Sequence, residues 1–174
     1  MNDSVIAFAH SLAASSLHDQ VVHWLRTTPG LPPILQTVHL LSIACLMGSI
    51  VLIDLRMLGL AAPSQNVSEM IRRLMPWTWT ALPLLFVTGA AFVIARPNRY
   101  ATNPVFGYKF ALLAPAVALA AVLHLLSKRE LGYWESAPSR RATAKIMAAI
   151  SLLLWLGVAL AGRWIAYADY LFDE

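Results

Sequence analysis

At 174 residues, with 59% hydrophobic and only 13% charged residues, the chain has no room for a water-soluble domain beside its long apolar segments. Its net charge of +4 comes from cations in the short loops between those segments. This pattern reports membrane topology and argues against a nucleic-acid partner. The single cysteine, Cys45, excludes an internal disulfide.

The first 30 residues predict an amphipathic segment on the outer surface of the membrane. Apolar residues between Asp3 and Thr27 recur at near-helical spacing with polar residues between them, which favours one or two short helices. The segment lacks the cationic start and the unbroken apolar run of a signal peptide. Prolines and a glycine at 29–33 interrupt it. We therefore expect a boundary between this segment, 1–30, and a membrane domain, 31–174.

Four uncharged apolar runs follow, each about the length of a bilayer span. An α-helix rises 1.5 Å per residue, so about 20 apolar residues cross a hydrocarbon core of about 30 Å. The sequence therefore predicts an all-α integral membrane four-helix bundle. The runs cover Ile34–Ile53, Leu74–Ala95, Phe110–Ser127 and Ile146–Gly162.

Lysines and arginines near the ends of the runs predict the orientation of the bundle. The first and third loops carry eight: Arg56, Arg72, Arg73, Lys128, Arg129, Arg140, Arg141 and Lys145. The other side carries five: Arg26, Arg96, Arg99, Lys109 and Arg163. Because cytoplasmic loops are enriched in cations, we expect these two loops inside and both termini outside.

Polar residues of the first run share one face of its helix. At about 100° per residue, Gln36 and Ser42 each lie about 60° from His39, on opposite sides of it. Asp54, at the far end of the run, also falls about 60° from His39, on the same face. Ionisable groups inside spans are costly, so His39 and Asp54 are functional candidates by default.

A second set of polar groups lies at the outer end of the fourth run. Arg163 has Tyr167 on its face at i+4. The first span begins outside and the fourth ends outside, which predicts a polar pocket of Gln36, His39, Arg163 and Tyr167 near the outer surface. Two alternatives stand beside it: Arg163 extends to headgroup phosphates, and His39 makes only a structural hydrogen bond.

Such a pocket suits haem b or a quinone headgroup. His39 would be the haem ligand, and therefore the metal ligand, or a hydrogen-bond partner; Arg163 would pair with a propionate or a quinone oxygen. Haem clamped between His39 and His124 is disfavoured, because the two imidazoles differ in depth by about 15 Å at 1.5 Å per residue. The N-terminal histidines, His10, His18 and His23, lack tight metal-ligand spacing and are expected at the surface.

Asp54 and His124 form the second candidate constellation, at the inner end of the bundle. A contact between them would make a proton-linked pair. The alternative is that Asp54 is neutralised by Arg56 or by the other cations of the first loop.

Three stretches resemble a family of small uncharacterised bacterial inner-membrane proteins with a four-helix domain of unknown function. They are Gln36-Thr-Val-His-Leu-Leu continuing to Asp54-Leu-Arg-Met-Leu-Gly59, Asn103-Pro-Val-Phe-Gly-Tyr-Lys109, and Gly162-Arg-Trp-Ile-Ala-Tyr167. The resemblance implies the fold and a multi-pass protein of the bacterial inner membrane. It implies no activity, cofactor or ligand residue.

Three functions are consistent with these patterns. The leading hypothesis is a redox or binding subunit with a haem b or quinone site near the outer face, at most the membrane subunit of an oxidoreductase. The second is a proton-linked transporter of small solutes that uses His39, Asp54 and His124. The third is a non-catalytic accessory or anchor subunit. The expected partners are the lipid bilayer and either other membrane subunits or further copies of this chain.

Overall fold

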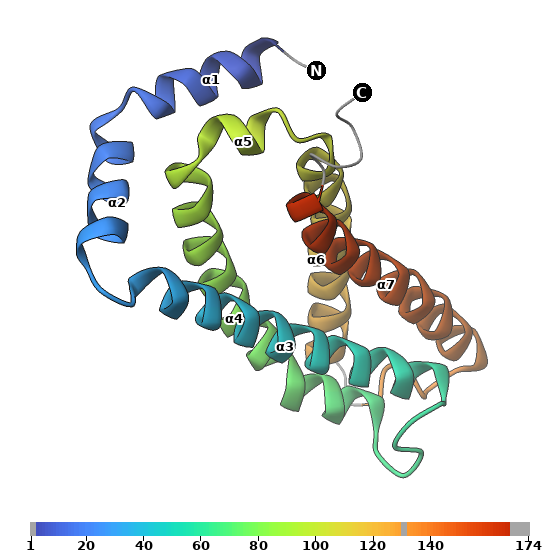
Figure 1. Ribbon diagram of the computed structural model, residues 1–174. Helices are drawn as coiled ribbons and strands as arrows, with labels where there is room; N and C mark the ends of the chain where they lie inside the picture. The colour runs from blue at the N-terminus through green and yellow to red at the C-terminus, as the bar shows by residue number, and fades with distance from the viewer. Residues whose placement is uncertain (1–2, 130–131, 168–174) are drawn as a thin grey trace.

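The computed structural model describes residues 3–129 and 132–167, and these residues contain helices and loops but no strand (Figure 1). Residues 168–174 of the predicted membrane domain lie outside the described part. The elements are α1 (Asp3–Ala13), α2 (Ser16–Thr27), α3 (Leu31–Leu58), α4 (Val67–Ala95), α5 (Pro97–Ala101), α6 (Pro104–Arg129), α7 (Pro138–Trp164) and the 3-10 turn η1 (Ile165–Tyr167).

Four of these elements are long and apolar enough to cross a membrane: Leu31–Leu58, Val67–Ala95, Pro104–Lys128 and Pro138–Tyr167. The predicted all-α fold with four spans is therefore confirmed. Four such helices are typical of a multi-pass membrane protein. Each helix is longer than the apolar run that predicted it. Hydrogen bonding along a helix does not require apolar side chains, so the helices continue into charged residues beyond the hydrocarbon core.

Local sequence signals set the helix ends around the first loop. Gly59 follows α3 with a φ of 84°, a left-handed conformation that glycine adopts without steric cost, and its N–H bonds the Arg56 carbonyl. Asn66 begins α4, where its side chain accepts a hydrogen bond from the Ser68 N–H.

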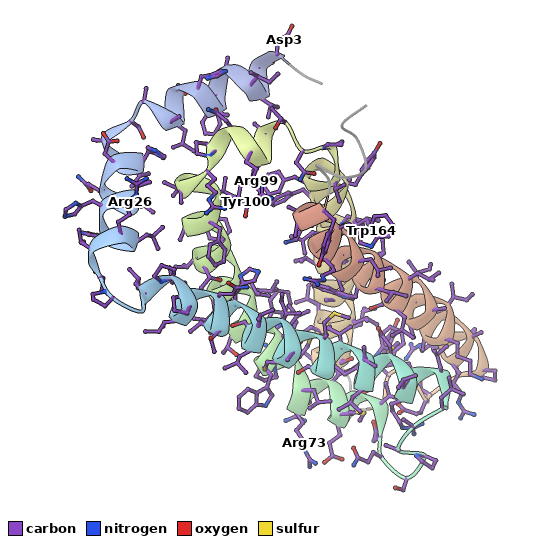
Figure 2. All side chains as sticks on the ribbon, viewed as in Figure 1. Asp3, Arg26, Arg73, Arg99, Tyr100 and Trp164 are labelled. Atoms are coloured by element: carbon purple, nitrogen blue, oxygen red, sulfur yellow. The ribbon has the colours of Figure 1, made fainter. Side chains whose placement is uncertain are left out.

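The four long helices form a ring in the order α3, α4, α6, α7, each packed against its two neighbours. We call the end where α3 begins and α7 finishes the α5 end, and the opposite end, where α3 reaches Leu58 and α7 starts at Pro138, the loop end. Figure 2 shows Arg73 at the loop end, and Arg99 and Tyr100 on α5 at the other. α3 and α6 therefore stand diagonally across the ring.

The predicted helical segment before the first span consists of two helices. α1 lies against α5, and α2 lies alongside α4, so that the pair borders the α5 end (Figure 1). One polar contact joins the segment to the bundle: His18 Nδ1 on α2 lies 2.7 Å from the Ile94 carbonyl on α4. Its position on the outer membrane surface stays a prediction.

The buried apolar core occupies only one half of the bundle. Its members are Leu46, Ile50, Ile53, Met57, Val67, Ile71, Met75, Ala81, Ala116, Ala120, Leu123, Trp134, Ala144, Ala148 and Trp155. They extend from the middle of the long helices to the loop end. The remainder, 31–44, 82–95, 104–115 and 156–164, we call the α5 half; it buries only Ser42, Thr88 and Val105. Most of the described side chains in this half are therefore half-buried or exposed.

Candidate functional site

His39 is held against α4 by a hydrogen bond within the α5 half. Its Nδ1 lies 2.7 Å from the hydroxyl oxygen of Thr88, a residue 3% exposed. The Thr88 hydroxyl itself lies 2.6 Å from the Leu84 carbonyl. A carbonyl only accepts, so the single hydroxyl proton goes to Leu84, and His39 Nδ1–H must donate to Thr88. In the neutral imidazole, Nε2 therefore carries a lone pair and no proton.

The His39 ring lies beside a residue that has no side chain. A Cβ built on Gly89 would stand 3.7 Å from His39 Cε1, the carbon between the two ring nitrogens. Phe92, one turn further along α4, meets the ring edge-on, with centroids 5.8 Å apart and planes at 75°. No described residue makes a hydrogen bond to Nε2. The ring is thus fixed in orientation while its acceptor nitrogen is left available.

Lys109 brings a positive charge into the same half of the bundle. It lies in the second turn of α6 and is half-buried, and its charge acts on His39. A Cβ on Gly162 of α7 would lie 3.8 Å from Lys109 Nζ, so the ammonium rests where α7 has no side chain. The one salt bridge among the described residues joins Arg73 and Glu69, which leaves Lys109 without a carboxylate partner there.

The other members of the predicted outer pocket lie at the surface of their helices. Gln36 is exposed on α3. Arg163 donates to the Tyr167 hydroxyl at 2.7 Å and its guanidinium lies 5.0 Å from the Tyr167 ring centroid, and both residues are exposed. Within the described chain, no hydrogen bond joins this pair to His39 or Gln36. Of the four residues, the structure brings Arg163 and Tyr167 together, and His39 is joined to α4 instead.

Asp54 lies in the core of the other half of the bundle, which reaches the loop end and which we call the loop half. It is 1% exposed, and neither carboxyl oxygen has a hydrogen-bond partner among the described residues. The prediction that Arg56 or another cation of the first loop neutralises it is wrong. Arg56 Nε donates to the Gln65 carbonyl at 2.6 Å, because the loop after Gly59 folds back over the end of α3. Arg73 pairs with Glu69 instead.

His124 is not brought to Asp54. Its ring contacts Trp79 of α4, with centroids 6.0 Å apart, and its Nδ1 is buried with no hydrogen-bond partner. Asp54 faces Ser151 of α7 instead. The two residues stand on the diagonal helices α6 and α3, so each meets a different neighbour.

Metal-binding clusters are absent from the described residues, where no three His, Cys, Asp or Glu side chains gather. Of the N-terminal histidines, His10 and His23 are exposed, as predicted, and His18 is half-buried against α4. A metal at His39 would therefore have to be part of a cofactor that brings its own ligands.

Two residues of this region cannot be recognised as site residues from the sequence alone: Thr88 and Lys109. Thr88 makes a hydrogen bond between helices, but no periodicity in the sequence identifies His39 as its partner. Lys109 counts as a loop cation in the sequence because it directly precedes an apolar run. The signal that places it inside is the turn at Asn103-Pro104, where α6 begins five residues earlier.

Comparison with known proteins is consistent with this description. No curated protein and no solved structure matches the chain. One family model, described as a family of unknown function (DUF6644), matches residues 24–168, which include all four apolar helices. The chain thus belongs to this family of unknown function.

Proposed function

We propose that this protein is a membrane redox subunit that holds haem b in the α5 half of its bundle, with His39 Nε2 as an iron ligand. One observation carries the proposal: His39 has a free lone pair, Lys109 has no carboxylate partner among the described residues, and the two interact in the half of the bundle where few described residues are buried. Haem would supply electron transfer there.

The chemistry of His39 suits a metal ligand. Histidines that bind metals commonly donate their other ring N–H to an oxygen, which fixes the tautomer and the ring orientation. The Thr88 hydroxyl is such an oxygen for His39. Gly89 leaves the neighbouring edge of the ring uncovered by a side chain. We assign no second protein ligand to the iron.

The chemistry of Lys109 suits a propionate. Lys109 is half-buried and has no carboxylate partner among the described residues, and a haem carboxylate would give its ammonium a charge-assisted hydrogen bond. A quinone oxygen would also accept from Lys109, but it would need a proton on His39 Nε2 to bind both groups. The tautomer set by Thr88 therefore favours haem over a quinone.

The proposal is tested by a reduced-minus-oxidised visible spectrum of the protein purified in mild detergent after expression with added haem precursor. We expect a sharp α-band and one haem per chain. A flat spectrum from protein that is folded and monodisperse would refute the haem site and leave quinone binding, transport or an accessory role.

Substitutions at Gly89 test where the haem lies. Gly89→Ala should keep full haem content, because its Cβ makes an ordinary contact 3.7 Å from His39 Cε1. Gly89→Leu should reduce haem content at least tenfold, because its branched side chain would stand over the ring edge that leads to Nε2. Both variants are measured by haem-to-protein ratio and by thermal stability in detergent. Equal haem content in the two variants would place the haem elsewhere.

The transporter hypothesis has less support from the geometry. It requires His39, Asp54 and His124 to act along one pathway. Asp54 faces α7, His124 contacts Trp79, and His39 bonds Thr88, so each group has a different environment. For topology, we propose that the loop end is cytoplasmic and the α5 end periplasmic in a bacterial inner membrane, on the cation counts of the loops.

A further inference from the structure

Asp54 is a carboxyl sealed in the packed half of the bundle. It lies one turn before the end of α3, is 1% exposed, and is surrounded on its own helix by the buried Ile50, Ile53 and Met57. From α7, the hydroxyl of Ser151, also 1% exposed, faces it without closing a hydrogen bond. Neither Oδ1 nor Oδ2 has a hydrogen-bond partner among the described residues.

No described charged group on the surrounding elements forms an ion pair with this carboxyl. On α3, Arg56 is bound to the Gln65 carbonyl, and on α4, Arg73 is paired with Glu69. Of the other described cations near the loop end, Arg72, Lys128 and Lys145 are exposed, Arg140 donates to Ser136, and Arg141 donates to the Glu135 carbonyl. His124 of α6 contacts Trp79, and the titratable groups of α2 belong to the α5 end.

An ionised carboxylate in these surroundings would be uncompensated. Burying a lone charge costs far more than burying the neutral acid, so such a group either binds a cation or carries a proton. Hard metal cations such as calcium and magnesium take six or more oxygen ligands. The described side chains offer Asp54 only the Ser151 hydroxyl, which favours a proton.

A cleft at the loop end borders this part of the core. It has a volume of about 260 Å³, and its lining includes Met57 and Ala144 of the core together with the cations Arg56, Arg141 and Lys145. Asp54 itself does not line the cleft, but Met57, which does, is three residues further along α3, a rise of about 5 Å and a rotation of about 60°.

We propose that Asp54 is a proton-binding site, which takes up and releases a proton through the loop-end cleft. The core makes the proton necessary, and the cleft gives it a route to water. This site is separate from the one proposed at His39, fifteen residues and about 22 Å away along α3. Haem content therefore does not report whether Asp54 binds a proton, and the two proposals can be tested independently.

Infrared spectroscopy of the full chain in liposomes at neutral pH tests the proposal. The difference between wild type and Asp54→Asn should contain the carbonyl band of one protonated carboxyl, and this band should shift within minutes of transfer to D₂O. An absent band would mean that Asp54 is ionised, and a band that does not shift would mean that it is sealed from water. Either result would overturn the proposal.

Glu135 provides the matched control. Its Oε2 is also buried without a partner, but its Oε1 accepts from the Val67 N–H at the start of α4. Glu135→Gln keeps an acceptor at that position and should leave the band unchanged. Loss of the band in Glu135→Gln would assign the proton to Glu135 and contradict the proposal.

A second measurement needs no variant, in case Asp54→Asn fails to fold. An apolar carbodiimide reacts with protonated carboxyls in apolar surroundings, so in the wild type it should label Asp54, as read by peptide mass spectrometry. Glu69, which is 65% exposed and paired with Arg73, should remain unlabelled. Label on Glu69 with none on Asp54 would refute the proposal.

Discussion

His39→Ala is expected to remove the haem α-band and reduce haem content to less than a tenth of the wild-type value. The substitution deletes the only imidazole in the α5 half of the described long helices, and with it the proposed bond to iron. The measurement is the haem-to-protein ratio of detergent-purified protein, together with the reduced-minus-oxidised spectrum.

Two control variants separate ligation from damage to the fold. His23→Ala removes an exposed imidazole of α2 and should leave the spectrum unchanged. Thr88→Val removes the oxygen that positions His39 but keeps the ligand, so haem should bind more weakly, by about tenfold to a hundredfold. Stoichiometric haem with an unaltered α-band in His39→Ala would exclude this residue as a ligand.

Trp155→Ala is expected to cause the largest loss of stability among single core substitutions, about 3–5 kcal/mol. Trp155 is 2% exposed and belongs to the core of the loop half. Removing its ring leaves a cavity that the surrounding helices fill only in part. The measurement is the free energy of unfolding in mixed micelles, obtained by titration with a denaturing detergent.

The neighbouring Leu156 is a built-in control. It is 53% exposed, and on a membrane-embedded helix its side chain would lie against lipid. Leu156→Ala should therefore change the free energy of unfolding by less than about 1 kcal/mol, because an apolar side chain gains little by leaving one apolar medium for another. Similar losses for the two variants would contradict the assignment of Trp155 to the core.

The two halves of the bundle differ in how closely the chain packs around their polar groups. In the loop half, apolar side chains surround Asp54, so an ionised carboxylate there would destabilise the fold. In the α5 half, few described side chains are buried, and His39 and Lys109 are themselves only half-buried. A site for a cofactor and a site for a proton are thus expected at different levels of the same four helices.

The fold was predictable because the hydrocarbon thickness sets the length of an apolar helix. Ile34–Ile53 and the three later runs each mark one observed span, and the polar turn at Asn66 marks the start of α4. The shared face of His39, Ser42 and Asp54 also follows from the helical period alone. These features depend on residues near one another in the chain.

The partners of these residues were decided by the tertiary structure. The period of α3 does not tell which helix lies beside His39, and only the ring order of the helices brings Thr88, 49 residues away, to its Nδ1. The same order separates Asp54 from His124 by placing their helices on a diagonal. Arg56, two residues from Asp54, points away from it because a loop carbonyl satisfies its guanidinium. Sequence period determines which face a side chain occupies, whereas packing between distant segments determines what that face meets.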